Sequence, residues 1–238
     1  MATGLDGKGA ATYIPIGMKY EESPQTVHEA DDGTEAQSCA VAVARGRPRQ
    51  FDPEKALTAA LQVFWQRGYE GASIAELTEA MGITKPSLYA CFGNKESLFR
   101  KALDLYERDK LAYARNAMNA PTAKGVAEQM LRGAISLQIG TNDPRACLGV
   151  MSAVACTTFD DSIRDEVMAR RASADHVILE RFRRAEAEGD LPAGVTPEAL
   201  AAYLMAVMQG MGVQAASGAS SEQLTQLVET TLALWPGR

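Results

Sequence analysis

A cluster of polar residues opens a segment of only ten residues that lies between Gly82 and Gly93. Thr84, Lys85 and Ser87 stand at its start, and their hydroxyl and ammonium groups can hydrogen-bond to base edges or to phosphate oxygens. A helix of this length is only marginally stable in water by itself, so neighbouring elements must hold it. The side chains that it presents outward are therefore the features that most need a function.

The first helix that could brace this segment is predicted to begin at Pro53, with Asp52 as its cap. A missing backbone N–H is harmless at that position, because the first amides of a helix have no intrahelical partner. Apolar residues then recur at helical spacing, and Gly68 is expected to end the helix. The apolar positions are Leu57, Ala60, Leu61 and Phe64.

A second helix is predicted from the capping box formed by Ser73 and Glu76, with Gly82 as its stop. The short segment between Gly82 and Gly93 is predicted to be the third helix, and a fourth helix begins at Asn94 or Lys95. Two short helices joined by a tight glycine turn and braced by an earlier helix form a helix-turn-helix. In such units the first residues of the second helix meet the base edges of the DNA major groove.

The block from Gln50 to about Lys110 resembles the DNA-binding domain of the TetR/AcrR family of transcriptional regulators. The resemblance implies a homodimeric, one-component regulator, most often a repressor, that binds a near-palindromic operator and responds to a small molecule. The partners that it implies are therefore double-stranded DNA, a second copy of the chain and an effector that the sequence does not name. The matching positions are Gly68, Tyr69, Ser73, Ala80, Met81, Gly82, Leu88, Tyr89, Phe92 and the run 95–98.

The resemblance also implies which residues contact DNA. Ser73 would touch a phosphate through its amide and hydroxyl, and Tyr89 and Lys95 would grip phosphates on either side of the groove. The basic run 45–49 resembles an arm that enters the minor groove or contacts phosphate, and a solubilising flank is its plainer alternative. The predicted DNA-contacting residues are Arg47, Arg49, Ser73, Thr84, Lys85, Pro86, Ser87, Tyr89 and Lys95.

The pattern stays helical beyond Pro121, and no convincing alternating run of β-branched residues appears. The predicted fold class is all-α with about nine helices, in which a three-helix helix-turn-helix domain precedes a larger helical bundle. We predict a disordered tail over 1–44, the DNA-binding domain over 45–110, with the helix-turn-helix at about 73–92, and a ligand-binding and dimerisation domain over 111–238. Its helices are expected at about 123–140, 146–157, 161–188, 196–216 and 221–235.

Two functions are expected of the larger bundle. Its earlier helices are predicted to enclose an apolar ligand pocket, and its last two helices to pair with their copies in a four-helix bundle. The candidate pocket residues are Leu131, Ile135, Met151, Val154, Phe159 and Phe182. The candidate dimer residues are Val207, Met211, Gln214, Leu224, Leu227, Val228 and Leu232.

The charge distribution agrees with a local contact to an anion. The whole chain has a formal net charge of −6, whereas residues 45–101 hold nine basic and six acidic residues, a net charge of +3. A modest positive island in an acidic protein indicates a directed contact and not general adhesion to polyanions.

Several functional classes are disfavoured. No metal-binding or hydrolase motif occurs, so we expect no enzyme activity, no cofactor and no metal. The run 210–215 has the spacing of a dinucleotide-binding motif but continues a helical pattern and follows no strand. The longest uncharged run contains glutamines, serines and three glycines, which is a poor composition for a membrane span, and no secretory signal opens the chain. A cytoplasmic location with reduced thiols is expected.

Alternative functions remain open. Four cysteines form no CxxC pair, and Cys91, Cys147 or Cys156 would be the sensor if the regulator responded to oxidants or electrophiles. A helical adaptor that binds protein and an enzyme that uses the helical bundle are the remaining alternatives.

Overall fold

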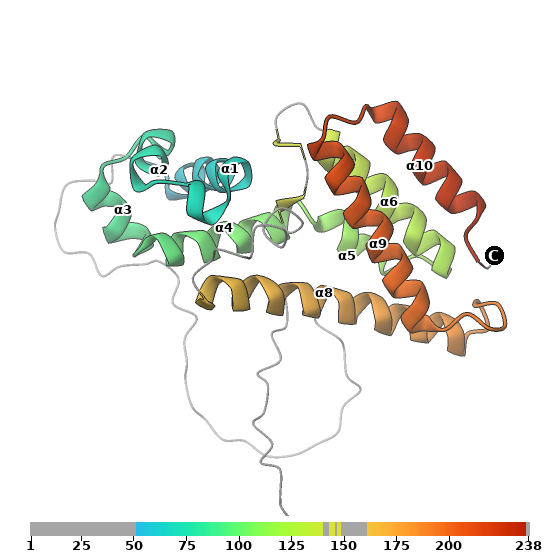
Figure 1. Ribbon diagram of the computed structural model, residues 1–238. Coiled ribbons are helices and arrows are strands. Elements are labelled where there is room, and N and C mark those ends of the chain that lie inside the picture. Colours follow the sequence, from blue (N-terminus) through green and yellow to red (C-terminus); the bar gives the residue numbers. More distant parts are fainter. Residues whose placement is uncertain (1–50, 140–142, 146, 149–160, 237–238) are drawn as a thin grey trace, which may run out of the picture.

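The computed structural model describes residues 51–139, 143–145, 147–148 and 161–236. Over these residues the chain forms nine helices and no strand, which confirms the all-α fold class. Figure 1 shows α1 to α4 gathered in one part and α5, α6, α9 and α10 in another, while α8 runs along both. The helices thus form a small N-terminal unit and a larger C-terminal one that share a long connecting helix.

The N-terminal unit comprises α1 (Pro53–Gly71), α2 (Ile74–Met81), α3 (Lys85–Phe92) and α4 (Lys95–Asp109). Asp52 caps α1 as predicted, because its carboxylate accepts the amide of Glu54 at 3.0 Å. Gly68 has φ 70° and ψ 177° and kinks the helix, but helical structure resumes as far as Gly71. The expectation that Gly68 ends the first helix is therefore corrected to a kink.

One apolar core holds these four helices together. Phe64 of α1, Leu77 of α2 and Leu88 of α3 are fully buried. Leu98 and Phe99 of α4 are also fully buried in the same cluster. Because α3 has only eight residues, its position depends on this shared core and not on its own hydrogen bonds.

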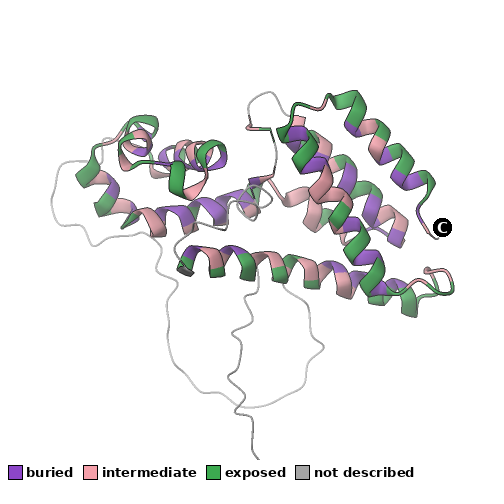
Figure 2. Ribbon diagram, in the orientation of Figure 1, coloured by how far each residue is buried: buried purple, intermediate pink, exposed green. Residues whose placement is uncertain are grey.

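The larger unit comprises α5 (Ala112–Ala117), α6 (Ala123–Ile139), α8 (Asp161–Ala187), α9 (Pro197–Ala216) and α10 (Ser221–Ala233). The helix predicted at 146–157 lies almost wholly outside the described residues. Helices α6, α9 and α10 contribute to a second apolar core with α8, and buried and exposed residues alternate along α10 in Figure 2. Helices α6 and α10 are amphipathic and direct their apolar sides into this core, whereas α9 is apolar over most of its surface and only part of it is buried there.

The short helix α5 was not predicted. The Arg115 guanidinium of α5 donates hydrogen bonds to the carbonyl oxygens of Glu107 and Arg108, in the last turn of α4. These carbonyls have no intrahelical amide partner, so the arginine satisfies them and holds α5 against the end of α4. Contacts of this kind leave no periodic signal in the sequence.

An ion-pair cluster joins α8 to α4. The Arg170 guanidinium of α8 lies 2.7 Å from the Asp104 carboxylate and 3.1 Å from that of Glu107, both on α4, and 2.7 Å from Glu166 on its own helix. The Arg170 side chain is only 9% exposed. Burial raises the pKa of Glu107, and the guanidinium opposes that rise. This cluster, called the Arg170 clamp below, ties the larger unit to the helix behind α3.

A second polar link lies after α6. Asp143 accepts a hydrogen bond from the Gln62 side chain of α1 at 3.0 Å and forms an ion pair with Lys110, at the end of α4, at 2.6 Å. The Asp143 side chain is 16% exposed, so the pair is partly shielded from solvent. One carboxylate therefore connects the end of α6 to two helices of the N-terminal unit.

Replacing Arg170 tests the importance of the clamp. Arg170→Met retains much of the volume but removes the cation that Asp104, Glu107 and Glu166 share, and Glu166 then keeps its longer ion pair with Arg100, at 3.6 Å. We expect the free energy of unfolding to fall by about 2–3 kcal/mol, below the range for a fully buried pair because Asp104 is partly exposed. Urea denaturation followed by circular dichroism measures this difference.

The matched control is Arg132→Met. Arg132 pairs with Glu128 and Glu229 on the surface, where its side chain is 45% exposed. Exposed pairs contribute about 0–1 kcal/mol, so this variant should unfold close to the wild type. Equal losses for the two variants would show that the clamp contributes no more than an ordinary surface pair.

Candidate nucleic-acid interface

A left-handed glycine makes the turn between α2 and α3. Gly82 has φ 64° and ψ 31°, a conformation that residues with a Cβ rarely adopt. The amides of Gly82 and Ile83 donate to the carbonyl oxygens of Glu79 and Thr78 at 3.1 and 3.0 Å, which closes the end of α2. The chain can then start α3 after only two more residues.

The first turn of α3 is closed by its own side chains. Thr84 is the N-cap, and its hydroxyl oxygen accepts the amide of Ser87 at 3.3 Å. The two hydroxyl groups lie 2.9 Å apart. Pro86 occupies the first turn, where its lack of an amide hydrogen is tolerated. The local sequence therefore specifies this helix start independently of any ligand.

The predicted contact residues of α3 lie on its solvent side. Thr84, Lys85, Pro86 and Tyr89 are exposed, and Ser87 is half-buried. Tyr89 is 43% exposed and the Lys85 ammonium lies 5.9 Å from its ring centroid, so packing in the core does not explain the tyrosine. The structure brings these five residues together on one surface, and their contact with DNA stays a prediction.

The environment of Ser73 differs from the expectation. Its amide and its hydroxyl both donate to one carboxylate oxygen of Glu76, at 3.0 and 2.9 Å. These hydrogen bonds hold the pKa of Glu76 below its usual value. The predicted capping box is confirmed, but the two donors expected to contact a phosphate are engaged with a carboxylate. A phosphate contact at Ser73 requires Glu76 to move.

Lys95 is the first residue of α4 and is half-buried. Its ammonium lies 4.4 Å from the ring centroid of Tyr69, and burial lowers the pKa of Lys95 while the charge of Glu70 opposes that change. The alternative that Lys95 is a plain surface charge does not account for this placement. The other predicted contacts, Arg47 and Arg49, lie outside the described residues.

The predicted ligand pocket is placed only in part. Leu131 and Phe182 are fully buried in the second core, and Ile135 is partly buried against it. The remaining candidates, Met151, Val154 and Phe159, lie outside the described residues.

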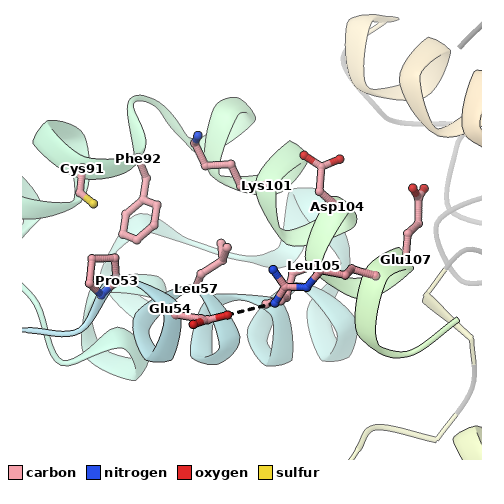
Figure 3. A pocket seen from close by; sticks show the side chains of 10 residues that line it. Pro53, Glu54, Leu57, Cys91, Phe92, Lys101, Asp104, Leu105 and Glu107 are labelled. Carbon is pink, nitrogen blue, oxygen red and sulfur yellow. Dashed lines mark hydrogen bonds and ion pairs between the residues drawn. The ribbon is translucent and has the colours of Figure 1, made fainter. Parts of the chain in front are cut away.

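A hollow of about 470 Å³ lies elsewhere, between α1, α3 and α4 (Figure 3). Leu57, Phe92 and Leu105 are among its apolar lining, and an ion pair of Glu54 with Arg108, 3.0 Å long, crosses its edge. This hollow belongs to the N-terminal unit and does not coincide with the predicted pocket.

Burial corrects part of the predicted dimer face. Met211, Leu224 and Val228 are fully buried within one protomer, where α9 and α10 share a core with α6, and Leu232 is 7% exposed. Their side chains are therefore not available to a second copy. Gln214 is exposed, and Val207 and Leu227 are half-buried. The exposed large apolar residues of α9 are Tyr203 and Val213.

Two residues next to the predicted DNA contacts, Tyr69 and Glu76, had no functional role predicted for them. Tyr69 was only a matching position in the resemblance, although its ring contacts the ammonium of a predicted phosphate-binding lysine. Glu76 was only a helix cap, although its carboxylate takes up the donors of Ser73. A capping-box pattern next to a predicted phosphate contact is the signal that could have indicated Glu76.

Comparisons with known proteins agree with this geometry. The model of a family described as bacterial regulatory proteins, tetR family, matches residues 56–102. The HTH-type transcriptional repressor ComR of Escherichia coli (strain K12) is 35% identical over 206 residues, which cover 85% of this chain and 97% of ComR. The chain belongs to the TetR family.

Other relatives extend over most of this TetR-family chain. The HTH-type transcriptional repressor BdcR of Escherichia coli (strain K12) is 29% identical over 181 residues, or 75% of this chain and 86% of BdcR. A cysteine-substituted form of the TetR family transcriptional regulator CifR, solved with 26-base-pair double-stranded operator DNA, is 42% identical with a TM-score of 0.73. That likeness covers 80% of this chain and 100% of CifR.

The ionised carboxylate of Glu76 predicts that the stability of the folded protein depends on pH. Its folded-state pKa lies below the ordinary value of 4.5, so the stability that its carboxylate contributes is present above that value and is lost as the pH falls through the folded-state pKa. We expect Glu76→Gln to be less stable than wild type at pH 7, and the difference to shrink in acid. Thermal unfolding of both proteins at a series of pH values from 7 down to 3 measures this difference in stability.

Glu222→Gln is the control, because Glu222 is an exposed residue in the first turn of α10. Its difference from wild type should stay small across the pH range. A Glu76→Gln difference that remains constant on acidification would contradict a role for the ionised carboxylate at the start of α2.

Proposed function

We propose that this TetR-family protein is a homodimeric transcriptional repressor that binds a near-palindromic DNA operator and leaves it when a small molecule binds. The observation that carries the proposal is the exposed polar surface at the start of α3, on a helix whose inner side is buried. Relatives that match most of the chain are named as transcriptional repressors, which supports the same function here.

The geometry suits DNA for a chemical reason. Lys85, Thr84 and Ser87 offer an ammonium and two hydroxyls that hydrogen-bond to base edges, and Pro86 offers apolar contact to a thymine methyl. Lys95 stands at the amino end of α4, where backbone amides also favour an anion. Base contacts supply sequence specificity and phosphate contacts supply position, and α3 and α4 divide these roles.

Capture of genomic DNA by the purified protein, followed by sequencing, tests the proposal and gives the operator. Lys85→Ala should weaken binding to that operator by about tenfold and reduce discrimination against a random duplex. Lys95→Ala should weaken binding to both duplexes alike and reduce the slope of affinity against salt by about one phosphate contact. Fluorescence anisotropy over a series of salt concentrations measures both effects.

Lys124→Ala is the matched control, because Lys124 lies on α6, outside the N-terminal unit, and the substitution removes the same charge. Its affinity and salt slope should equal those of the wild type. Wild-type protein that retains no genomic fragment, even at low salt, would refute the proposed function and favour a helical protein-binding adaptor.

The dimer is supported by the composition of α9. Among the described residues, α9 alone is long and apolar enough to cross a membrane by length and composition, and only 33% of its most apolar stretch is buried within the protomer. Tyr203 and Val213 are 40% and 49% exposed. An apolar surface of this kind favours packing against a second copy, whose two-fold symmetry would place the two α3 helices about one DNA turn, ~34 Å, apart.

Val213→Asp places a charge on this surface and should convert the dimer to monomers at micromolar concentration, because a carboxylate cannot be buried there without a partner. Light scattering coupled to size-exclusion chromatography gives the mass directly. Met168→Asp is the control, since Met168 on α8 is also 49% exposed. If the Val213 variant stays dimeric, or both variants dissociate, the dimer surface does not centre on α9.

Release by a ligand requires that the two units be mechanically connected. The Arg170 clamp and the Asp143 link supply such connections, since they hold α4 against α8 and α1 against the segment after α6. A ligand changes DNA affinity only if it binds differently to conformations that place the two α3 helices differently. Leu131 and Phe182 remain the described candidates for the apolar wall of its pocket.

A cysteine sensor is the second candidate for the signal. Cys147 is half-buried at the junction of the two units, and its sulfur accepts a hydrogen bond from the Tyr106 hydroxyl of α4 at 3.2 Å. Cys91 is half-buried beside the hollow under α3, and Cys156 lies outside the described residues. Alkylation with iodoacetamide that leaves operator affinity unchanged would exclude all three as sensors.

A further inference from the structure

The ring of Tyr69 is fixed by the kink in α1. Gly68 turns the backbone with φ 70°, and the ring of Tyr69 then stacks on Phe64 with centroids 6.4 Å apart and planes inclined by 17°. Phe99 of α4 contacts the same ring at a centroid distance of 5.1 Å. Because both phenylalanines are fully buried, the tyrosine ring packs directly on the core of the N-terminal unit.

The Lys95 ammonium lies against this ring. The distance of 4.4 Å from Nζ to the ring centroid is well inside the range of about 6 Å for a cation–π interaction. The pair formed by Lys85 and Tyr89 on α3 is looser, at 5.9 Å, and both of its members are exposed. Of these two lysines, Lys95 is thus the one whose charged group is held by the fold.

Lys95 lies at a position in α4 where a positive charge is unfavourable, so its contact with the ring of Tyr69 needs an explanation. It is the first residue of α4, where the helix dipole disfavours a cation. The cap of this helix, Asn94, accepts the amide of Ser97 at 2.7 Å through its side chain. The electron-rich ring offsets part of that unfavourable field. An anion bound between the ammonium and the first amides of α4 would offset the rest.

We propose that Tyr69 is a positioning residue for DNA binding, whose ring holds the Lys95 ammonium at the amino end of α4 in the geometry that a backbone phosphate requires. The inference rests on the proposed function. A lysine that is already restricted loses less conformational entropy when the phosphate arrives, so the ring contributes to affinity without touching DNA. Since a phosphate contact carries no sequence information, the contribution is the same for every duplex.

A double-mutant cycle tests this role. Affinities for the captured operator and for a random duplex of equal length are measured for wild type, Tyr69→Leu, Tyr69→Phe, Lys95→Met and the double variant Tyr69→Leu with Lys95→Met. We expect Tyr69→Leu to weaken both complexes by about two- to fivefold per half-site, and Tyr69→Phe to retain most of the affinity because it keeps the ring. In the Lys95→Met background, Tyr69→Leu should have no further effect.

Two controls separate positioning from stability. Urea denaturation shows whether each variant is folded under the binding conditions. If Tyr69→Leu is not folded, pentafluorophenylalanine at position 69 replaces it, because this residue keeps a ring of similar size but loses the negative face that attracts the ammonium. Its expected effect is the same two- to fivefold loss.

The outcomes distinguish the two proposals. If Tyr69→Leu lowers DNA affinity equally in the presence and in the absence of Lys95, the positioning role is overturned. The same holds if the Tyr69→Phe variant binds DNA as weakly as the Tyr69→Leu variant. Either result would leave DNA binding by the wild type intact. Wild-type protein that binds neither duplex would instead refute the proposed function, and the role of Tyr69 with it.

Discussion

An eight-residue helix in water does not keep its shape unaided, and the rest of the N-terminal unit depends on that constraint. Burial of Leu88 and Phe92, at 0% and 5% exposure, fixes α3 to α1, α2 and α4. The same burial decides which side chains remain outside. The polar surface of α3 is therefore a consequence of the core beneath it, and a change in that core alters the surface even where no surface residue is replaced.

The fixed position of α3 also makes it controllable from a distance. Helix α4 supplies Leu98 and Phe99 to the core under α3, and the same helix carries Asp104 and Glu107 to the Arg170 clamp. A rigid helix that is packed at one end and ion-paired at the other transmits a displacement better than a flexible linker would. Helix α4 therefore connects the core under α3 to the Arg170 clamp through these two kinds of contact.

Local signals predicted the helix starts well, and the sequence was less informative about partners across space. Asp52 and Ser73 each cap the helix that their position indicated, because a cap is specified within four residues. Thr84, predicted as the first residue of its helix, lies one position earlier, as the N-cap. In contrast, the apolar period of α9 and α10 shows that one side is buried but not whether the protomer or a second copy buries it. Met211 and Leu224 proved internal for this reason. The contact of Lys95 with Tyr69 spans a kink and two helices, which no periodic pattern records.

The net charge of −6 limits how this chain can bind DNA, and so gives importance to the few predicted contacts between lysines and phosphates. A chain of this charge gains little from long-range attraction to a polyanion, and at physiological salt the field of each group is screened over about 8 Å. Affinity for DNA must then come from a few cations placed very near phosphates. The proposed role of the partly buried Tyr69 ring is to supply that placement for Lys95 inside the fold, before the nucleic acid arrives. Short-range positioning, not total charge, is in this view what allows an acidic protein to bind DNA.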